Sequence, residues 1–216
     1  MPVLPAHHLC CAFRNDFIYN SRDYVERTKG ILSNAHTGGT VTEPDRKYRF
    51  SWKLLGDMNA GRPNLGPTTR LEAYRLMQFT FRDVLEQELG AEKADAIFYR
   101  AGFLSGTEFY KNALGSPSDL ASFIKKLQDQ LAEMKIGVLR IERADIKQGS
   151  FVMTVSEDLD CSGLPETGFG VCVYDEGFIA GLMEAFTGVP HTVKEIDCWC
   201  TGDRTCRFSI TRVAAP

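Results

Sequence analysis

The cysteines near the C-terminal end of the chain constrain its fold more than any other feature. Three of the seven cysteines, Cys198, Cys200 and Cys206, lie within nine residues. A Thr-Gly-Asp-Arg turn at 201–204 separates two strand-like runs, so we expect a hairpin. With a loop at 202–204, Cys200 would face Cys206, and Cys198 would share their sheet face because strand side chains alternate. The three thiols are therefore predicted to be neighbours.

Neighbouring thiols indicate a metal site, and zinc is the ion that suits them best. Structural zinc takes four protein ligands, often thiolates, which leave no open position for a substrate. Cys172, on the segment before the hairpin, is the best candidate for the fourth ligand. Glu195 would point to the opposite face of a regular strand. It could take part only if the strand has a bulge or a bend near Asp197.

Other interpretations of the cysteines stay open at this point. Free cysteines are often simply buried, and Cys200 and Cys206 could form a disulfide in an oxidising compartment. The odd number of cysteines and a polar N-terminus unlike a signal peptide favour thiols or metal ligands in a cytoplasmic protein. Cys161 could carry a reactive thiol, but no base for it is identified. The acidic residues of 157–160, just before it, are interpreted as a solvated turn.

The spacing of these residues resembles the 4-vinyl-reductase domain family, which includes the sensor domains of bacterial phenol-responsive activators. The family pattern is a cysteine before a Gly-rich helix, then Glu-x-x-Cys, a Gly-Asp turn and Cys-x-Phe. Its elements here are Cys172, Gly177, Gly181, Glu195, Cys198, Gly202, Asp203, Cys206 and Phe208. The resemblance covers about residues 67–213. It implies zinc ligands at Cys172, Glu195, Cys198 and Cys206. Cys200 stands where the family usually has a small or apolar residue, so it could replace Glu195.

The resemblance also implies a fold and a function. The fold would be that of the TRAPP subunits of vesicle tethering, and the function would be binding of a small hydrophobic or aromatic ligand by a homodimer. The implied pocket lies between the third helix of the domain, the strand that contains Phe151 and the Gly-rich helix. Its candidate wall residues are Phe123, Leu127, Phe151 and Phe178. The third helix has no histidine to bind a phenol hydroxyl, so phenol itself is not the expected ligand.

Apolar periodicity predicts three helices in the first half of this domain. A capping box at Thr69-x-x-Glu72 would open the first, with an apolar stripe that includes Met77 and Phe81 and a stop at Gly90. The second is expected over 91–114. There, Gly102 and Gly106 lie one turn apart and would let another backbone approach closely.

The third helix is predicted to begin at Pro117 and to continue to about residue 134. Strands are expected over 137–146 and 150–156, followed by the Gly-rich helix and the cysteine hairpin. Helices followed by neighbouring strands indicate an α+β fold, with helices packed on an antiparallel sheet.

Residues 1–66 are predicted to form an N-terminal extension that precedes the domain at 67–216. A stretch rich in Gly and Pro at 61–67 marks the boundary. Within the extension, the pattern predicts a helix over 17–32 and a strand over 47–54 with one apolar and one basic face.

Composition excludes some classes of function. The net charge of −3 gives no electrostatic basis for binding nucleic acid, and no apolar run approaches the ~18 residues of a membrane span. No phosphate loop, dinucleotide fingerprint or nucleophile elbow occurs in the sequence. We therefore expect a cytoplasmic, zinc-stabilised module that acts as a sensor or carrier. The alternatives are a reductase of a tetrapyrrole vinyl group and a protein-interaction scaffold.

Overall fold

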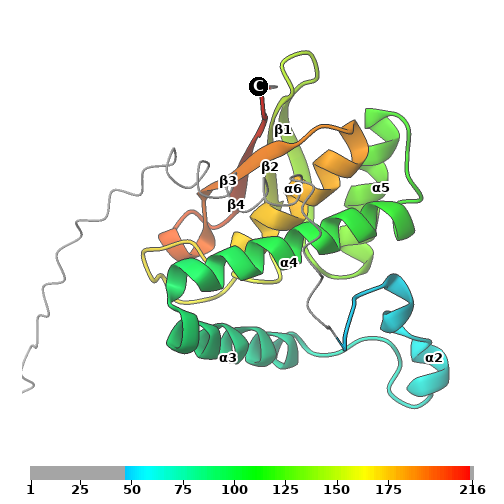
Figure 1. Cartoon of the computed structure of the whole chain (residues 1–216), viewed down its shortest axis with the longest axis vertical. Coiled ribbons are helices and arrows are strands. Elements are labelled where there is room, and N and C mark those ends of the chain that lie inside the picture. The colour runs from blue at the N-terminus through cyan, green and yellow to red at the C-terminus, as the bar shows by residue number, and fades with distance from the viewer. Residues whose placement is uncertain (1–46, 215–216) are drawn as a thin grey trace, which may run out of the picture. The chain divides into compact units, whose positions relative to one another are not determined.

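The chain divides into two compact units, residues 1–49 and residues 50–216, and the computed structural model describes residues 47–214. The predicted helix over 17–32 lies outside the described residues, and the boundary near residue 66 stays a prediction. The second unit confirms the α+β class, with helices packed on a four-stranded antiparallel sheet (Figure 1).

The order of strands in the sheet is β1-β2-β4-β3, and all neighbours are antiparallel. On its covered side α6 packs against β3 and α5 against β1, then α4 packs against α6 and α3 against α4. In chain order the elements are η1 Trp52–Leu55, α2 Met58–Gly61, α3 Leu71–Leu89, α4 Ala91–Asn112, α5 Leu120–Glu133, β1 Val138–Asp145, β2 Ser150–Ser156, α6 Val173–Thr187, β3 His191–Asp197, η2 Trp199–Thr201 and β4 Cys206–Arg212.

The predicted strands agree with the structure except for the first. The strands expected over 137–146 and 150–156 are β1 and β2, but the strand expected over 47–54 is wrong. A 3-10 helix occupies Trp52–Leu55 instead. The ring of Trp52 packs edge-on against Phe109 of α4, with 6.3 Å between ring centroids, so contact with a helix replaces pairing with a strand.

Two predicted helix starts are also wrong. Helix α3 begins after Arg70 with no side-chain cap, because Glu72 pairs with the Arg70 guanidinium instead of returning to the backbone. Helix α5 begins after Asp119, whose carboxylate accepts the Ser122 N–H at 2.9 Å. Pro117 therefore precedes the helix rather than opening it.

Close contact between α4 and α6 depends on glycines of both helices. A Cβ atom at Gly106 would lie 2.0 Å from the carbonyl oxygen of Phe178, and one at Gly177 would lie 2.0 Å from that of Tyr99. Gly102 and Gly181 meet backbone oxygens in the same way. The predicted role of Gly102 and Gly106 is confirmed, and the partner backbone is the Gly-rich helix α6.

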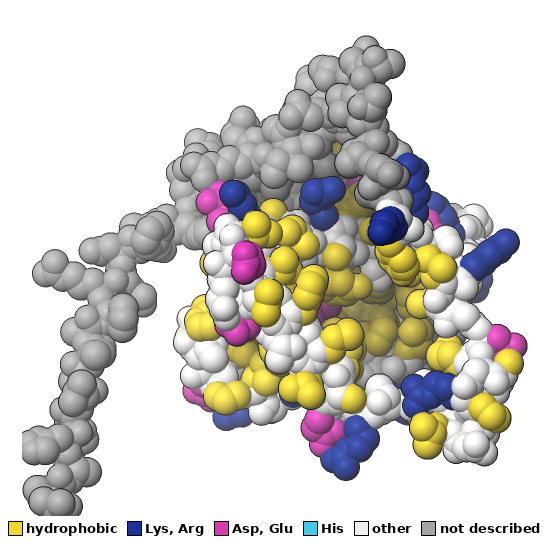
Figure 2. Space-filling model, turned by 60° about the horizontal axis from the view of Figure 1, so that its bottom comes forward, with side chains coloured by type: hydrophobic (Ala, Val, Ile, Leu, Met, Phe, Trp, Pro, Cys, Tyr) yellow, Lys and Arg dark blue, Asp and Glu magenta, His cyan; other side chains and the backbone are white. Residues whose placement is uncertain are grey.

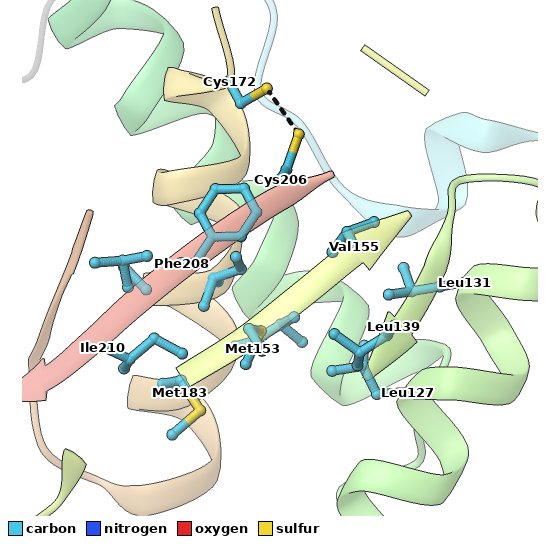
Figure 3. Close-up of a cluster of buried hydrophobic side chains, with 14 of the residues drawn as sticks. Leu127, Leu131, Leu139, Met153, Val155, Cys172, Met183, Cys206, Phe208 and Ile210 are labelled. Atoms are coloured by element: carbon cyan, nitrogen blue, oxygen red, sulfur yellow. Dashed lines mark hydrogen bonds between the residues drawn. The ribbon is translucent and has the colours of Figure 1, made fainter. Parts of the chain in front are cut away.

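The core lies between the sheet and helices α5 and α6. Phe208 and Ile210 of β4 are fully buried beside Met183 of α6, and Leu127 and Leu131 of α5 close the far side (Figure 3). Burying each of these side chains contributes about 1.5–3 kcal/mol to stability.

Candidate metal centre and ligand pocket

Four buried cysteines meet between the start of α6 and the β3–β4 connection. Their Sγ atoms all lie within 4.8 Å of one another, and each residue is at most 2% exposed. Cys172 precedes α6, Cys198 follows β3, and Cys206 opens β4. Cys161 comes from the loop between β2 and α6. Figure 3 shows the thiols of Cys172 and Cys206 turned toward each other.

The spacing of these sulfurs fits a tetrahedral metal ion. The Sγ of Cys172 lies 3.9 Å from that of Cys198 and 3.8 Å from that of Cys206. Zinc–thiolate bonds of about 2.3 Å in a tetrahedron separate the sulfurs by about 3.8 Å. The sulfurs of Cys161 and Cys206 are closer, at 3.0 Å. Soft thiolates in this arrangement favour zinc.

The structure brings together three of the four implied ligands and adds Cys161. Glu195, the remaining one, is close by: β3 shifts register between Glu195 and Asp197, which is the irregularity that its participation requires. One carboxylate oxygen of Glu195, Oε1, is buried without a hydrogen-bond partner. Burial, followed by the charge of Cys198, raises the pKa of Glu195 to about 8. The fourth ligand is thus a matter for proposal between Glu195 and Cys161.

The register predicted for Cys200 is wrong. Residues 198–205 join β3 to β4 and include the 3-10 helix Trp199–Thr201, so Cys200 lies on no strand and does not face Cys206. The wider turn has a local cause. The Thr201 hydroxyl accepts the Cys198 N–H at 3.2 Å and donates to the Asp203 carboxylate at 2.7 Å. Cys200 is fully buried outside the four-sulfur group, and none of the cysteines in residues 47–214 forms a disulfide.

The loop that carries Cys161 is held by an aspartate turn. Asp158 Oδ1 accepts the backbone N–H groups of Asp160 and Cys161 at 2.9 and 3.0 Å. The Tyr74 hydroxyl donates to Asp160 at 2.7 Å. Asp158 and Asp160 are only 4% and 3% exposed, so the interpretation of 157–160 as a solvated turn is wrong for these two residues.

Helix α3 fastens the same loop from outside. The guanidinium of Arg75 donates to the carbonyl oxygens of Leu159 and Ser162, both at 2.9 Å. Sequence reasoning missed Cys161 as a member of the cluster. The available signal was the Asp-x-x-Cys spacing, because an aspartate often accepts backbone N–H groups two and three residues ahead.

Negative charge is concentrated at this centre. The pKa of Cys198 is lowered because Cys161, and then Cys172 and Cys206, donate to its sulfur. Burial raises the pKa of Asp158 to about 6 and that of Asp175 well above its usual range. An oxygen of Asp175 is buried with no hydrogen-bond partner. Thiols and carboxylates gathered away from water favour a bound cation.

Two hollows lie elsewhere in the described residues. The smaller, of about 250 Å³, is lined by Phe151 and Phe186 together with His191 and Arg212. The larger, of about 440 Å³, is more open and includes Phe103.

Of the four expected wall residues, Phe151 lines the smaller hollow. Phe123 and Leu127 are 2% exposed within the core, where Phe123 stacks on Phe186 at 4.4 Å. Phe178 packs edge-on against Phe109 of α4, with ring centroids 5.3 Å apart. These three residues line neither hollow, and their role in ligand binding stays a prediction.

Helix α3 leaves much of its predicted apolar stripe exposed. Met77, Phe81 and Val84 are 66%, 56% and 53% exposed. Figure 2 shows hydrophobic side chains gathered on the face of the molecule that carries this helix. No helix within residues 47–214 is both long and apolar enough to cross a membrane.

Comparisons with known proteins agree with this architecture. Residues 151–212 match the model of the vinyl-4-reductase domain. An uncharacterized protein of Methanocaldococcus jannaschii, MJ1642, is 26% identical over 149 residues, which cover 69% of this chain and 81% of that protein.

Solved structures share the fold. A vinyl-4-reductase family protein from Methanocaldococcus jannaschii has a TM-score of 0.51 and 17% identity, covering 69% of this chain and 85% of its own. The phenol-responsive sensory domain of the transcription activator PoxR, solved with phenol, has a TM-score of 0.51 and 19% identity, covering 67% and 75%. A weaker likeness, with a TM-score of 0.47 and 13% identity over 67% and 98%, is to a trafficking protein particle complex subunit 3 from Naegleria fowleri. Residues 151–212, which include all four clustered cysteines, form a vinyl-4-reductase domain.

Proposed function

We propose that this chain is a zinc-stabilised cytoplasmic module that binds a small hydrophobic or aromatic molecule, as a sensor or carrier, and that it works as a homodimer. The observation that carries the proposal is the group of four buried cysteine sulfurs within 4.8 Å of one another. The match to the vinyl-4-reductase domain and the fold shared with the PoxR sensory domain support the ligand-binding part.

The zinc would have a structural role. Its ligands come from the loop before α6, from the start of α6 and from both ends of the β3–β4 connection, so one ion would fasten three segments. Four protein ligands close the coordination shell and leave no position for water or substrate. Cys172, Cys198 and Cys206 would supply three ligands. Either Glu195, as the family resemblance implies, or Cys161 would supply the fourth.

Metal analysis of matched variants tests this site. We expect about one zinc per chain in the native protein and loss of zinc in Cys206→Ala. Glu195→Ala and Cys161→Ala identify the fourth ligand, because only the variant that removes a ligand should lower zinc content strongly. Cys200→Ala is the control, since Cys200 is buried but lies outside the sulfur group. Native protein purified without chelator and free of zinc would contradict the proposal.

The ligand-binding part rests on the smaller hollow. Small-molecule sites are concave and mostly apolar, with a few convergent polar groups. The hollow of about 250 Å³ matches this description, because Leu120, Phe151 and Phe186 form its apolar wall beside His191 and Arg212.

Binding can be measured by calorimetry with a panel of small aromatic probes, including phenol, benzamide and benzoate. We expect at least one probe to bind, and Phe151→Ala to weaken its binding. If no probe binds and the native protein carries no ligand mass, the chain is better described as an interaction scaffold.

A further inference from the structure

The smaller hollow has a polar end that the proposed function leaves unused. His191, the first residue of β3, is 5% exposed, and its Nδ1 lies 2.9 Å from the carbonyl oxygen of Val189. A carbonyl oxygen only accepts, so Nδ1 carries a proton and donates. The other ring nitrogen, Nε2, is buried and has no hydrogen-bond partner. A buried and unpartnered polar atom beside a hollow indicates a missing ligand group.

Arg212 supplies positive charge at the same place. It is the last residue of β4, and its side chain lies over Gly149, where a Cβ atom would meet Arg212 Nε at 2.8 Å. Arg212 also lowers the pKa of His191 by its charge, after burial as the larger cause, so the two groups face each other. No ion pair joins Arg212 to an acidic residue within 47–214, and no Asp or Glu lines the hollow. This guanidinium is therefore available to an anion from solution.

A helix end adds to the positive potential. Leu120, which lines the hollow, is the first residue of α5, and the N-terminus of a 14-residue helix favours negative charge. Asp119, the N-cap of that helix, is directed to the Ser122 N–H and does not line the hollow. Opposite the polar end lie the rings of Phe151 and Phe186, which offer an apolar surface to the body of a ligand.

We propose that the hollow binds a small aromatic carboxylic acid, whose carboxyl group lies between Arg212 and His191 Nε2 and whose ring lies against Phe151 and Phe186. This inference rests on the proposed function and names its ligand class. One carboxyl oxygen accepts from the Arg212 guanidinium, a pairing that two parallel hydrogen bonds make directional. The other oxygen shares one proton with His191 Nε2, because the neutral ring offers only a lone pair there. Binding of the carboxylate form therefore takes up one proton.

The size of the hollow limits the ligand. A volume of about 250 Å³ accommodates a single aromatic ring with a carboxyl group and excludes a long acyl chain. Neutral aromatic compounds of the same shape would fill the apolar part but leave Arg212 without an anion. The charge of the ligand should therefore decide affinity more strongly than its shape.

Calorimetric titration with benzoate and with benzamide, its neutral isostere, tests the inference. We expect benzoate to bind at least about tenfold more tightly than benzamide, and Arg212→Gln to remove this preference with a loss of about tenfold in benzoate affinity. Arg143→Gln, which alters an exposed arginine of β1, is the matched control and should change neither titration. Arg212 is exposed, so Arg212→Gln should fold normally.

Proton uptake provides a second measurement. Repeating the benzoate titration at pH 7.5 in buffers of different ionisation enthalpy should show uptake of about one proton, because the carboxyl and imidazole groups share it. His191→Phe should abolish the uptake. Equal affinity for benzoate and benzamide, or unchanged benzoate binding in Arg212→Gln, would overturn this inference and leave the proposed function standing. Failure of every aromatic probe to bind would overturn both.

Discussion

Replacing Gly106 by alanine tests the contact on which the helical layer depends. The added Cβ would lie 2.0 Å from the carbonyl oxygen of Phe178, whereas ordinary contact begins at 3.4 Å. The atom that it meets belongs to the backbone of α6, so no side chain can turn away to relieve the overlap. Helix α6 would have to move by about 1 Å, which close-packed interiors resist.

The expected magnitude follows from two opposing effects. Alanine stabilises a helix interior relative to glycine by about 1 kcal/mol, and overpacking costs about 1–3 kcal/mol or more. Because the overlap is with backbone, we expect the cost to exceed that range and the net loss to be about 2 kcal/mol or more. For a domain of this size, that loss lowers the melting temperature by about 4–8 °C.

Thermal unfolding followed by circular dichroism measures this effect. Gly61→Ala is the matched control, because Gly61 also lies in a helix and its Cβ would meet nothing within 4 Å. We expect the control to leave the melting temperature unchanged or slightly raised. A Gly106→Ala protein as stable as the native one would refute the close packing of α4 on α6.

Three further outcomes follow from the structure. Glu176 is 2% exposed and its Oε1 accepts the Glu195 N–H at 2.9 Å, so Glu176→Ala should leave that N–H unsatisfied and cost about 1–3 kcal/mol in chemical denaturation, with a part of this loss absent from Glu176→Gln. The apolar face of α3 is the candidate for the proposed homodimer, so Phe81→Lys should shift the protein toward monomer in light scattering while Gln87→Lys on the same helix should not; a monomeric native protein would contradict this. Burial and Arg212 lower the pKa of His191 below 6.5 against the opposing effect of the Val189 carbonyl, so the folded state binds fewer protons there than the unfolded state and the free energy of unfolding should fall as the pH drops below about 6.5. His191→Gln should weaken that fall, and an unchanged pH profile would show that His191 titrates alike in both states.

Sequence reasoning predicted the helices and strands of the domain well, because their periodicity reflects one buried side of each element. β2 has the predicted bounds, and the glycines of α4 and α6 meet as their spacing suggested. The strand expected at 47–54 failed because alternation alone does not supply a neighbouring strand. The starts of α3 and α5 failed because several residues near each start could act as the cap, and the loop conformation chose among them.

The metal centre was predictable only in part, for a physical reason. Cys172, Cys198 and Cys206 belong to a spacing that elements of regular structure bring together. Cys161 reaches the same point through an irregular loop, whose course depends on the Asp158 turn and on the contact with Arg75. Cys200 shows the reverse case. An ideal hairpin would place it opposite Cys206, but the capping interaction of Thr201 bends the connection into a 3-10 helix.

The metal centre and the smaller hollow lie at opposite ends of the same elements. Helix α6 begins beside Cys172 and ends at Thr187, which lines the hollow, while β3 runs from His191 to the bulge after Glu195. A bound zinc would fix one end of this helix and strand, and a ligand would contact the other. If zinc raises the affinity for ligand by ordering these shared elements, the ligand must raise the affinity for zinc by the same factor, because coupling between two sites is reciprocal. The buried glycine contact between α4 and α6 lies between the two sites, so a loosened helix pair should weaken both.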